Sequence, residues 1–393
     1  MAKPPLPRLL LRTLYRLQQR IRGQIHNATS KAGKVEEGGI LVCLGTLNHV
    51  RAFRPVLDRL PTEDITLLVF YGQVHDEMGR QGLDFLKGEA FIPTAGLGAD
   101  DFLPTALKEA VKHFKPRLLV AMNSAFDSIG QERNIPTLII RHGLLVDHPA
   151  HIQDVKHSHI ACLGNLDRDL LEKKASIPSR RLHVTGFSRF DALLGQEFNR
   201  KELLHKYELS PSEKHILVVT QPHQNPWDLS PEEAKGFLVS VLKAGVELGK
   251  EGQKVCLIIK THPREDPGFH KGLVEETGSS ARVFSDAQAS LQEICFLSDV
   301  MVTSFSTAGL EALLMNKPLV TVNFGGDKEP IPFHEKGGSL GVISEEELLP
   351  ALQQALRGKT GKDVEGFLQQ ALGEQDRGAS ERIAKLIRSL AGP

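Results

Sequence analysis

The feature of this sequence that most constrains its fold is an alternation of short apolar runs with helix-length amphipathic stretches. The apolar runs lie at residues 40–44, 65–70, 117–121, 137–140, 159–163 and 182–185, then at 215–220, 255–260, 300–303, 319–323 and, weakly, near 342. Short runs rich in leucine and β-branched residues, bounded by Gly, Pro or His, are typical of strands buried on both faces. Because crossover helices fit between the runs, the pattern predicts βαβ units and mainly parallel sheets.

The pattern starts afresh after a charged, helical stretch near residues 192–213, which indicates two domains. A chain of 393 residues also exceeds what one ordinary core supports. We therefore predict an α/β protein with two Rossmann-like doubly wound domains that face a cleft. The predicted parts are a basic N-terminal segment (1–38), an N-terminal domain (39–190), a C-terminal domain (191–345) and C-terminal helices (346–393).

The composition is that of a globular protein without a charge bias. Lys+Arg and Asp+Glu each number 48, so nothing indicates bulk nucleic-acid binding, which usually needs a basic excess. No signal peptide and no apolar run of about 18 residues is evident, so we expect a cytoplasmic protein without a spanning helix. The cysteines are scattered without zinc spacing, and Cys43, Cys162 and Cys256 lie in apolar runs, which predicts buried free thiols.

The N-terminal segment is basic and has a helical period. Residues 3–22 carry no acidic side chain, and their basic residues are Lys3, Arg8, Arg12, Arg16, Arg20 and Arg22. Apolar residues recur at three- and four-residue spacing and would form one stripe on a helix. Such a helix is suited to an anionic membrane surface. The alternatives are a helix packed on the protein and a loosely ordered tail.

The strongest motif follows the run at 300–303, where a strand should end and a helix should begin near Ser306. Ser304, Ser306 and Thr307 supply hydroxyls, and the free N–H groups of a helix N-terminus suit a diphosphate. Glu311, further into the helix, is placed to accept hydrogen bonds from ribose hydroxyls. The alternative is an ordinary serine N-cap on a crossover helix.

A second cluster, made of Lys260, His262 and Arg264, follows the run at 255–260. Lys260 and Arg264 can neutralise a diphosphate, and His262 can act as a general acid or base or donate to a phosphate oxygen. Gln221, after the run at 215–220, is a weaker candidate for the same diphosphate site. The alternative is a solvated polar loop.

The first half of the chain offers weaker clusters after its own apolar runs. His142 would face the cleft from the opposite domain, and the following glycine permits a tight turn. Gly45, His49 and Arg189 are predicted to contact substrate, against the alternatives of an ordinary glycine turn and a structural hinge. The other histidines between 148 and 159 match no zinc-binding spacing, so we predict no metal site.

These segments resemble the GT-B nucleotide-sugar transferases over roughly residues 40–345. The nearest group holds CDP-glycerol glycerophosphotransferases, capsule polysaccharide transferases and UDP-N-acetylglucosamine 2-epimerases. Residues 304–307 with Glu311 resemble the Asp-Tyr-Ser-Ser segment and downstream acid of the glycerophosphotransferases, with Ser304 in place of the Asp. The segments around His142 and His262 resemble the two histidine segments of that family.

The resemblance implies an enzyme whose nucleotide-diphosphate donor is a substrate and which needs no other cofactor. The C-terminal domain would hold the donor, and the N-terminal domain would hold a saccharide or lipid-linked acceptor. His142 would activate the acceptor, and His262 would bind or protonate the leaving phosphate. The implied reaction moves a glycosyl or glycerophosphate group into a bacterial surface polysaccharide or teichoic-acid-like polymer, at the inner face of the cell membrane.

Two alternatives stay open. An epimerase-like enzyme is suggested by residues 45–46, 184–186 and 262–266, which resemble epimerase segments. However, residues 47–49 are Leu-Asn-His where the epimerases have Arg-Pro-Glu, which removes proton-transfer groups. The other alternative, from a different class, is a non-catalytic nucleotide-sugar-binding assembly protein, which would bind nucleotide without turning it over.

Overall fold

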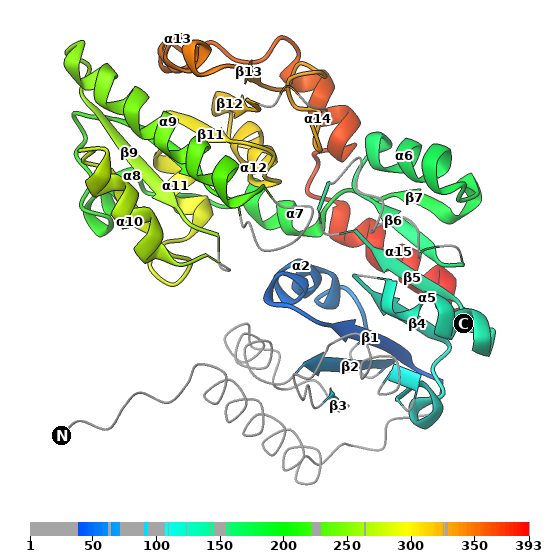
Figure 1. Cartoon of the computed structure of the whole chain (residues 1–393). Helices are drawn as coiled ribbons and strands as arrows, with labels where there is room; N and C mark the ends of the chain where they lie inside the picture. Colours follow the sequence, from blue (N-terminus) through cyan, green and yellow to red (C-terminus); the bar gives the residue numbers. More distant parts are fainter. Residues whose placement is uncertain are drawn as a thin grey trace, which may run out of the picture. The chain divides into compact units, whose positions relative to one another are not determined.

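A computed structural model, drawn in Figure 1, describes most of the chain with several gaps. The described residues are 38–61, 64–70, 90–92, 107–108, 110–122, 124–141, 143–144, 155, 157–221, 229–262, 265–324, 326 and 329–392. The basic segment at 3–22, His142 and Arg264 lie outside them. Among the helices within these ranges, none is long and apolar enough to cross a membrane.

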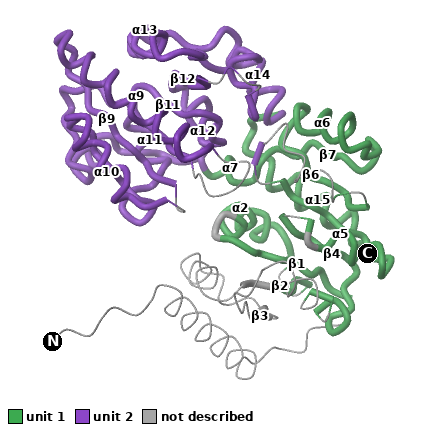
Figure 2. Tube along the Cα trace, viewed as in Figure 1, with its two compact units in different colours: residues 1–142, 149–192, 374–393 green, residues 143–148, 193–373 purple. Residues whose placement is uncertain are grey.

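The chain divides into two compact units, which Figure 2 colours separately. Unit 1 comprises Met1–His142, Pro149–Ala192 and Glu374–Pro393, and unit 2 comprises Gly143–His148 and Leu193–Gly373. The domain boundaries taken from the sequence stay a prediction. In the compact units, the last 20 residues group with the first part of the chain rather than with the helices that precede them.

Unit 1 is built on a parallel seven-stranded sheet in the order β3-β2-β1-β4-β5-β6-β7. Its strands are β1 (Ile40–Leu44), β2 (Ile65–Phe70), β3 (Ala90–Ile92), β4 (Leu118–Ala121), β5 (Thr137–Ile140), β6 (His159–Cys162) and β7 (Leu182–Val184). Its helical segments include α2 (Leu47–Leu57), η2 (Ser124–Phe126), α5 (Asp127–Arg133), α6 (Asn165–Ala175), η4 (Ser179–Arg181), α7 (Ser188–Leu194, which ends in unit 2) and α15 (Ala379–Ala391). This strand order is that of a Rossmann-like sheet with one extra strand, β7, at one edge.

Helix α15 joins unit 1 because a buried carboxylate caps it. Asp191 accepts hydrogen bonds from the N–H groups of Ala379, at 3.1 Å, and Ser380, at 2.7 Å. These are two of the N–H groups that a helix start leaves without an intrahelical partner. The helix then packs against α2 and β4, which explains why the end of the chain returns to the first sheet.

Unit 2 contains a parallel six-stranded sheet in the order β10-β9-β8-β11-β12-β13. Its strands are β8 (Lys214–Val219), β9 (Val255–Lys260), β10 (Arg282–Phe284), β11 (Val300–Thr303), β12 (Leu319–Val322) and β13 (Leu340–Val342). Its helices are α8 (Arg200–Lys206), α9 (Pro231–Lys250), α10 (Pro267–Glu276), α11 (Leu291–Leu297), α12 (Ala308–Leu314), α13 (Glu345–Leu356) and α14 (Val364–Leu372). The strand order is that of the Rossmann fold.

The core of unit 2 follows from the two-residue period of its strands. Alternate residues of β8, β11 and β12 share one buried cluster with α9 and α13: Ile216, Val218, Val300, Val302, Val320, Val322, Val241, Leu242, Leu348 and Leu352. Helix α9 starts at a capping box, in which Ser230 Oγ accepts from the Glu233 N–H and Glu233 accepts from the Ser230 N–H. Pro231 occupies the first position of the helix, where its missing N–H costs no intrahelical hydrogen bond.

The predicted fold class, two Rossmann-like doubly wound sheets, is confirmed. Strands β1, β2, β5, β9 and β11 have the predicted bounds. Strands β3 and β10 were not predicted, because each has three residues and lies at a sheet edge. An edge strand has one neighbour and need not form the long apolar run that marks a central parallel strand.

The four cysteines are free and buried, as predicted from their apolar surroundings. Burial raises the pKa of Cys43 to about 12 and that of Cys256 to about 11. These thiols are therefore protonated near neutral pH and act as small apolar groups of the two sheets.

A histidine pair on β6 and β7 should make stability sensitive to mild acid. His159 Nδ1 lies 3.0 Å from His183 Nε2, so the hydrogen bond needs a proton on one nitrogen and a lone pair on the other. Burial lowers the pKa of both rings, and that of His159 is lowered further by His183 and Arg181. Histidines in the unfolded chain titrate at about pH 6.5, so below that pH the unfolded state binds more protons than the folded state does. We expect the free energy of unfolding to fall as the pH drops from about 6.5 through the lowered pKa values.

Denaturant unfolding at about pH 7.5 and pH 5.5 measures this effect. The His183→Gln variant should lose less stability between these pH values than the wild type, because one buried titrating ring is gone. His205→Gln on the exposed face of α8 is the matched control and should behave like the wild type. An unchanged pH dependence in His183→Gln would rule the pair out as its source.

Gly309, at the start of α12, lies where packing leaves no room for a side chain. A Cβ at this position would lie 2.7 Å from Phe333 Cζ and 3.0 Å from Leu319 Cδ2. We expect Gly309→Ala to lower the free energy of unfolding by about 1–3 kcal/mol, the usual cost of overpacking. Gly236→Ala in α9 meets nothing within 4 Å and should instead stabilise by about 0.5–1 kcal/mol, so equal destabilisation of both variants would contradict the packing argument.

Candidate functional site

Three of the predicted clusters come together at one edge of the unit 2 sheet. Strands β9, β8 and β11 are neighbours and parallel, so their carboxyl ends lie side by side. Ligands of open parallel sheets bind at this edge. Direct contacts connect the carboxyl ends of these strands. The Thr220 N–H donates to the Lys260 carbonyl at 3.3 Å, and Thr303 Oγ1 donates to the Val219 carbonyl at 3.0 Å.

The segment 304–307, here called the hydroxyl turn, connects β11 to α12. Its four residues are partly exposed, and Ser306 Oγ accepts from the Ala308 N–H at 3.2 Å. The helix begins at Ala308, later than the predicted start at Ser306, and spans only 7 residues. Such a short helix contributes little dipole, so the hydroxyls and N–H groups of the turn are its main means of holding an anion.

Two residues from other segments lie next to the hydroxyl turn. Gln221 Oε1 accepts from the Phe305 N–H at 3.0 Å, which ties the turn to the end of β8. Gln221 therefore positions the turn through its oxygen, and the predicted contact of Gln221 with phosphate stays a prediction. Gly143, the residue after His142, lies beside Thr307, because a Cβ on it would be 3.7 Å from Thr307 Oγ1.

Lys260, at the end of β9, is buried and paired. Its side chain is 4% exposed, and its Nζ lies 3.2 Å from Asp286 Oδ1, just beyond β10. The charge of this lysine is therefore balanced within the protein. A direct contact between Lys260 and a diphosphate stays a prediction, and it requires the pair with Asp286 to be shared or exchanged.

A buried carboxylate and imidazole, Glu265 and His270, hold the loop that carries His262. Their side chains are 3% and 2% exposed, and Glu265 Oε1 lies 3.4 Å from His270 Nε2. Glu265 Oε2 accepts from the His262 N–H, at 2.7 Å, and from the Thr220 hydroxyl. Burial alone would raise the pKa of Glu265, but the hydrogen bonds from His270, Thr220 and His262 outweigh it and lower that pKa. The pair thus fixes the backbone at the predicted catalytic histidine.

The role of Glu265 and His270 was not foreseen from the sequence. Glu265 lies within the charged segment that drew attention to His262, and it is not among the predicted site residues. Its burial depends on α10, which begins at Pro267 and brings His270 back over the loop. The one available signal was a carboxylate two residues before Pro267, because proline is common at the first position of a helix.

Glu311, the predicted ribose ligand, is 4% exposed within α12. Burial is the main cause of the raised pKa of the Cys295 thiol on α11. The nearby Glu311 carboxylate raises that pKa further. Glu311 therefore lies toward the interior of unit 2 as well as near the hydroxyl turn. Contact with a ribose stays a prediction.

The predicted substrate residues of unit 1 have structural partners. His49 is 3% exposed, and its Nδ1 accepts from the Gly45 N–H at 3.1 Å, so this histidine holds the glycine turn in place. Arg141, next to His142, forms a buried ion pair in which its Nε lies 3.1 Å from Asp167 Oδ1. Arg189 is partly buried in α7. Substrate contacts of Gly45, His49 and Arg189 stay predictions.

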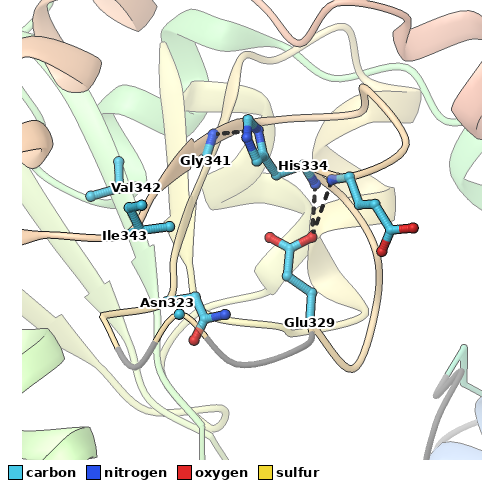
Figure 3. A pocket seen from close by; sticks show the side chains of 8 residues that line it. Asn323, Glu329, His334, Gly341, Val342 and Ile343 are labelled. Carbon is cyan, nitrogen blue, oxygen red and sulfur yellow. Dashed lines mark hydrogen bonds between the residues drawn. The ribbon is translucent and has the colours of Figure 1, made fainter.

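A pocket beyond β12 and β13 adds residues that the sequence did not single out, and Figure 3 shows it at close range. Its volume is about 280 Å³, and its lining consists of Asn323, Gly326, Glu329, His334, Glu335, Gly341, Val342 and Ile343. Asn323 directly follows β12, so the rule that located the other clusters pointed here too. Within the described ranges, no group of three or more metal-ligating side chains occurs.

The CDP-Glycerol:Poly(glycerophosphate) glycerophosphotransferase family matches residues 164–389, more than half of the 393-residue chain. The chain belongs to this family. This glycerophosphotransferase-family protein is a GT-B transferase, and the group that it transfers comes from a nucleotide-diphosphate donor. The match covers all of the unit 2 sheet and both segments that are predicted to bind phosphate, and it leaves out the part of the chain that contains His142.

Solved structures share the fold of this glycerophosphotransferase-family protein at low identity. A UDP-GlcNAc 2-epimerase from Neisseria meningitidis, bound to UDP-GlcNAc, has a TM-score of 0.65 and 15% identity over 89% of this chain and 99% of that chain. An S. aureus MnaA-UDP co-structure has a TM-score of 0.65 and 15% identity over 90% and 96%.

The wall teichoic acid polymerase TagF, soaked with CDPG, has a TM-score of 0.56 and 10% identity over 97% of this chain and 95% of that chain. No functionally curated relative matches the chain. At these identities, the solved structures establish the two-sheet fold, and the family match establishes the class of enzyme.

Proposed function

We propose that this protein transfers a glycerophosphate group from a CDP-glycerol-type donor to a hydroxyl of a growing bacterial surface polymer. Membership of the glycerophosphotransferase family carries this proposal. In this reaction the acceptor oxygen attacks the phosphorus that bears the glycerol, and the bond from that phosphorus to the CMP oxygen breaks. CMP leaves, and the acceptor hydroxyl loses its proton.

The roles of the residues follow from where the charges develop. We propose that Ser304, Ser306 and Thr307 hold the diphosphate through their hydroxyls and N–H groups, with Lys260 and Arg264 neutralising it. His262 would stabilise the leaving CMP phosphate, and the buried Glu265 keeps its loop in place. His142 would accept the proton of the acceptor hydroxyl, as the resemblance of its segment to a histidine segment of the family implies.

The acceptor and the membrane contact belong to the same proposal. A polymer hydroxyl, saccharide or lipid-linked, would meet the residues of unit 1, among them Gly45, His49 and Arg189. The basic segment at 3–22 would attach the enzyme to the anionic inner face of the cell membrane, where lipid-linked acceptors are found.

The test is a transfer assay with CDP-glycerol and a glycerophosphate-terminated acceptor, in which CMP release is measured. We expect acceptor-dependent CMP formation, and a thermal-shift screen should rank CDP-linked donors above UDP-, GDP- and CMP-linked ones. A ligand at about 100 times its dissociation constant adds about 2.7 kcal/mol of stability. Binding and turnover of only a UDP- or GDP-linked sugar would replace the glycerophosphate proposal with a glycosyl one.

A second candidate is an epimerase-like activity, which the epimerase fold of several solved structures favours. It predicts interconversion of UDP-N-acetylglucosamine, or release of a new free sugar, without any acceptor. NMR of the enzyme with this nucleotide sugar alone separates the two activities. Binding of nucleotide by calorimetry without turnover of any donor would instead indicate a non-catalytic binding protein.

A further inference from the structure

The pocket lined by Glu329 and Asn323 lies on the same sheet edge as the hydroxyl turn. Strand β12 pairs with β11 on one side and β13 on the other, all parallel. Asn323 directly follows β12 and Ile343 directly follows β13, so the pocket lies beside the carboxyl ends of these strands. A group bound there would be next along the edge from a diphosphate on the hydroxyl turn.

The charge of the described lining selects against phosphate. It contains the two carboxylates Glu329 and Glu335, and no lysine or arginine among its described residues. Like charges repel at short range, and bound phosphates are normally held by cationic or N–H groups. The carboxylates of the described lining therefore favour a neutral group over the diphosphate.

The polar groups of the lining suit hydroxyls. Glu329 is held in place because its Oε2 accepts from the His334 N–H at 2.9 Å, and the dashed lines in Figure 3 mark this contact. His334 Nδ1 accepts from the Gly341 N–H at 3.0 Å, so the proton of the neutral ring is on Nε2, where it can be donated. Carboxylate and amide oxygens with an imidazole N–H can both accept from and donate to hydroxyl groups.

An apolar wall and the size of the pocket further restrict the class of ligand that fits. Ile343 is 57% exposed, the largest exposed fraction of any large apolar residue among those described, and Val342 lies next to it in the lining. Such a wall matches the C–H face of a sugar or glyceryl unit. The volume of about 280 Å³ is below the usual range of about 300–1,000 Å³ for drug-sized ligands, which suits one small unit.

We propose that this pocket binds one neutral polyhydroxylated unit, a glyceryl or sugar group, with Glu329 and Asn323 accepting from its hydroxyls and Ile343 covering its C–H face. This inference rests on the proposed function and deepens it. The unit has two sources: the group attached to the donor diphosphate, or the terminal unit of the acceptor polymer. The experiment separates them.

Calorimetry compares CDP-glycerol with CDP, and UDP-N-acetylglucosamine with UDP, on the full chain. The variants are Glu329→Gln, which keeps an oxygen for the His334 N–H, and Ile343→Ser, whose exposed side chain contributes little to folding. Glu275→Gln, exposed on α10, is the matched control. If the donor supplies the unit, the preference for donor over bare nucleotide should fall about tenfold in both pocket variants and stay unchanged in the control.

If the acceptor supplies the unit, donor binding stays unchanged and the KM for acceptor rises by a similar factor in the two pocket variants. Saturation-transfer NMR with free glycerol and N-acetylglucosamine gives a readout that needs no nucleotide. Failure of any nucleotide to bind would overturn the proposed function alone. Wild-type values for the donor preference, the acceptor KM and the NMR signal in both pocket variants would overturn the pocket inference alone.

Discussion

Replacing Glu265 by alanine should lower the free energy of unfolding by about 3–5 kcal/mol, among the largest effects of any single change in unit 2. The change leaves His270 buried without its carboxylate, and it leaves the His262 N–H and the Thr220 hydroxyl without their acceptor. Each buried donor without a partner costs about 1–3 kcal/mol. Urea unfolding followed by circular dichroism measures the loss.

Two further variants make this prediction specific. Glu265→Gln retains an oxygen for the backbone N–H and should lose less stability than Glu265→Ala. Glu275→Ala, on the exposed face of the same α10, should change stability by no more than about 0.5 kcal/mol. If Glu265→Ala unfolds at the wild-type urea concentration, the buried pair does not hold the loop.

Replacing His262 by alanine should reduce the transfer rate by about 10²–10⁴, the usual contribution of a general acid or base. His262 is partly exposed, so its loss should leave folding largely intact. Because the side chain is proposed to act on the leaving phosphate, kcat should fall much more than the KM for the donor rises. His142→Ala should reduce kcat by a similar factor, through the acceptor.

The matched control for both histidines is His205→Ala, on the exposed face of α8. It should retain wild-type transfer. Steady-state CMP release, with circular dichroism to verify folding, is the measurement. Folded His262→Ala and His142→Ala variants with full activity would show that neither histidine takes part in the transfer.

The central strands could be predicted from the sequence because each is buried on both faces. The runs at 255–260 and 300–303 match β9 and β11 to the residue, and their alternation with helix-length stretches predicts the parallel sheets that the structure has. The polar segments after these strands then follow from a general rule about parallel sheets. The sequence therefore led to the hydroxyl turn and the His262 loop without knowledge of side-chain contacts.

Other features depend on contacts between distant parts of the chain. Asp191 caps a helix that starts 188 residues later, which no local pattern indicates. The ion pair of Lys260 with Asp286, across the end of β10, could likewise not be predicted from the sequence. The pocket forms only where the segments after β12 and β13 come together, so its full lining could not be predicted from the sequence even though Asn323 follows a predicted strand.

Calorimetric titration of CDP against the wild type and the Ser304→Ala/Thr307→Val double variant tests the account most directly. The account predicts that the wild type binds CDP and that the double variant binds at least about tenfold more weakly, since a hydrogen bond to a charged group contributes about 1.5–3 kcal/mol. Thr360→Val, exposed beyond α13, should bind like the wild type. Equal affinity of the wild type and the double variant, or no binding of CDP at all, would contradict the claim that the hydroxyl turn holds the donor diphosphate.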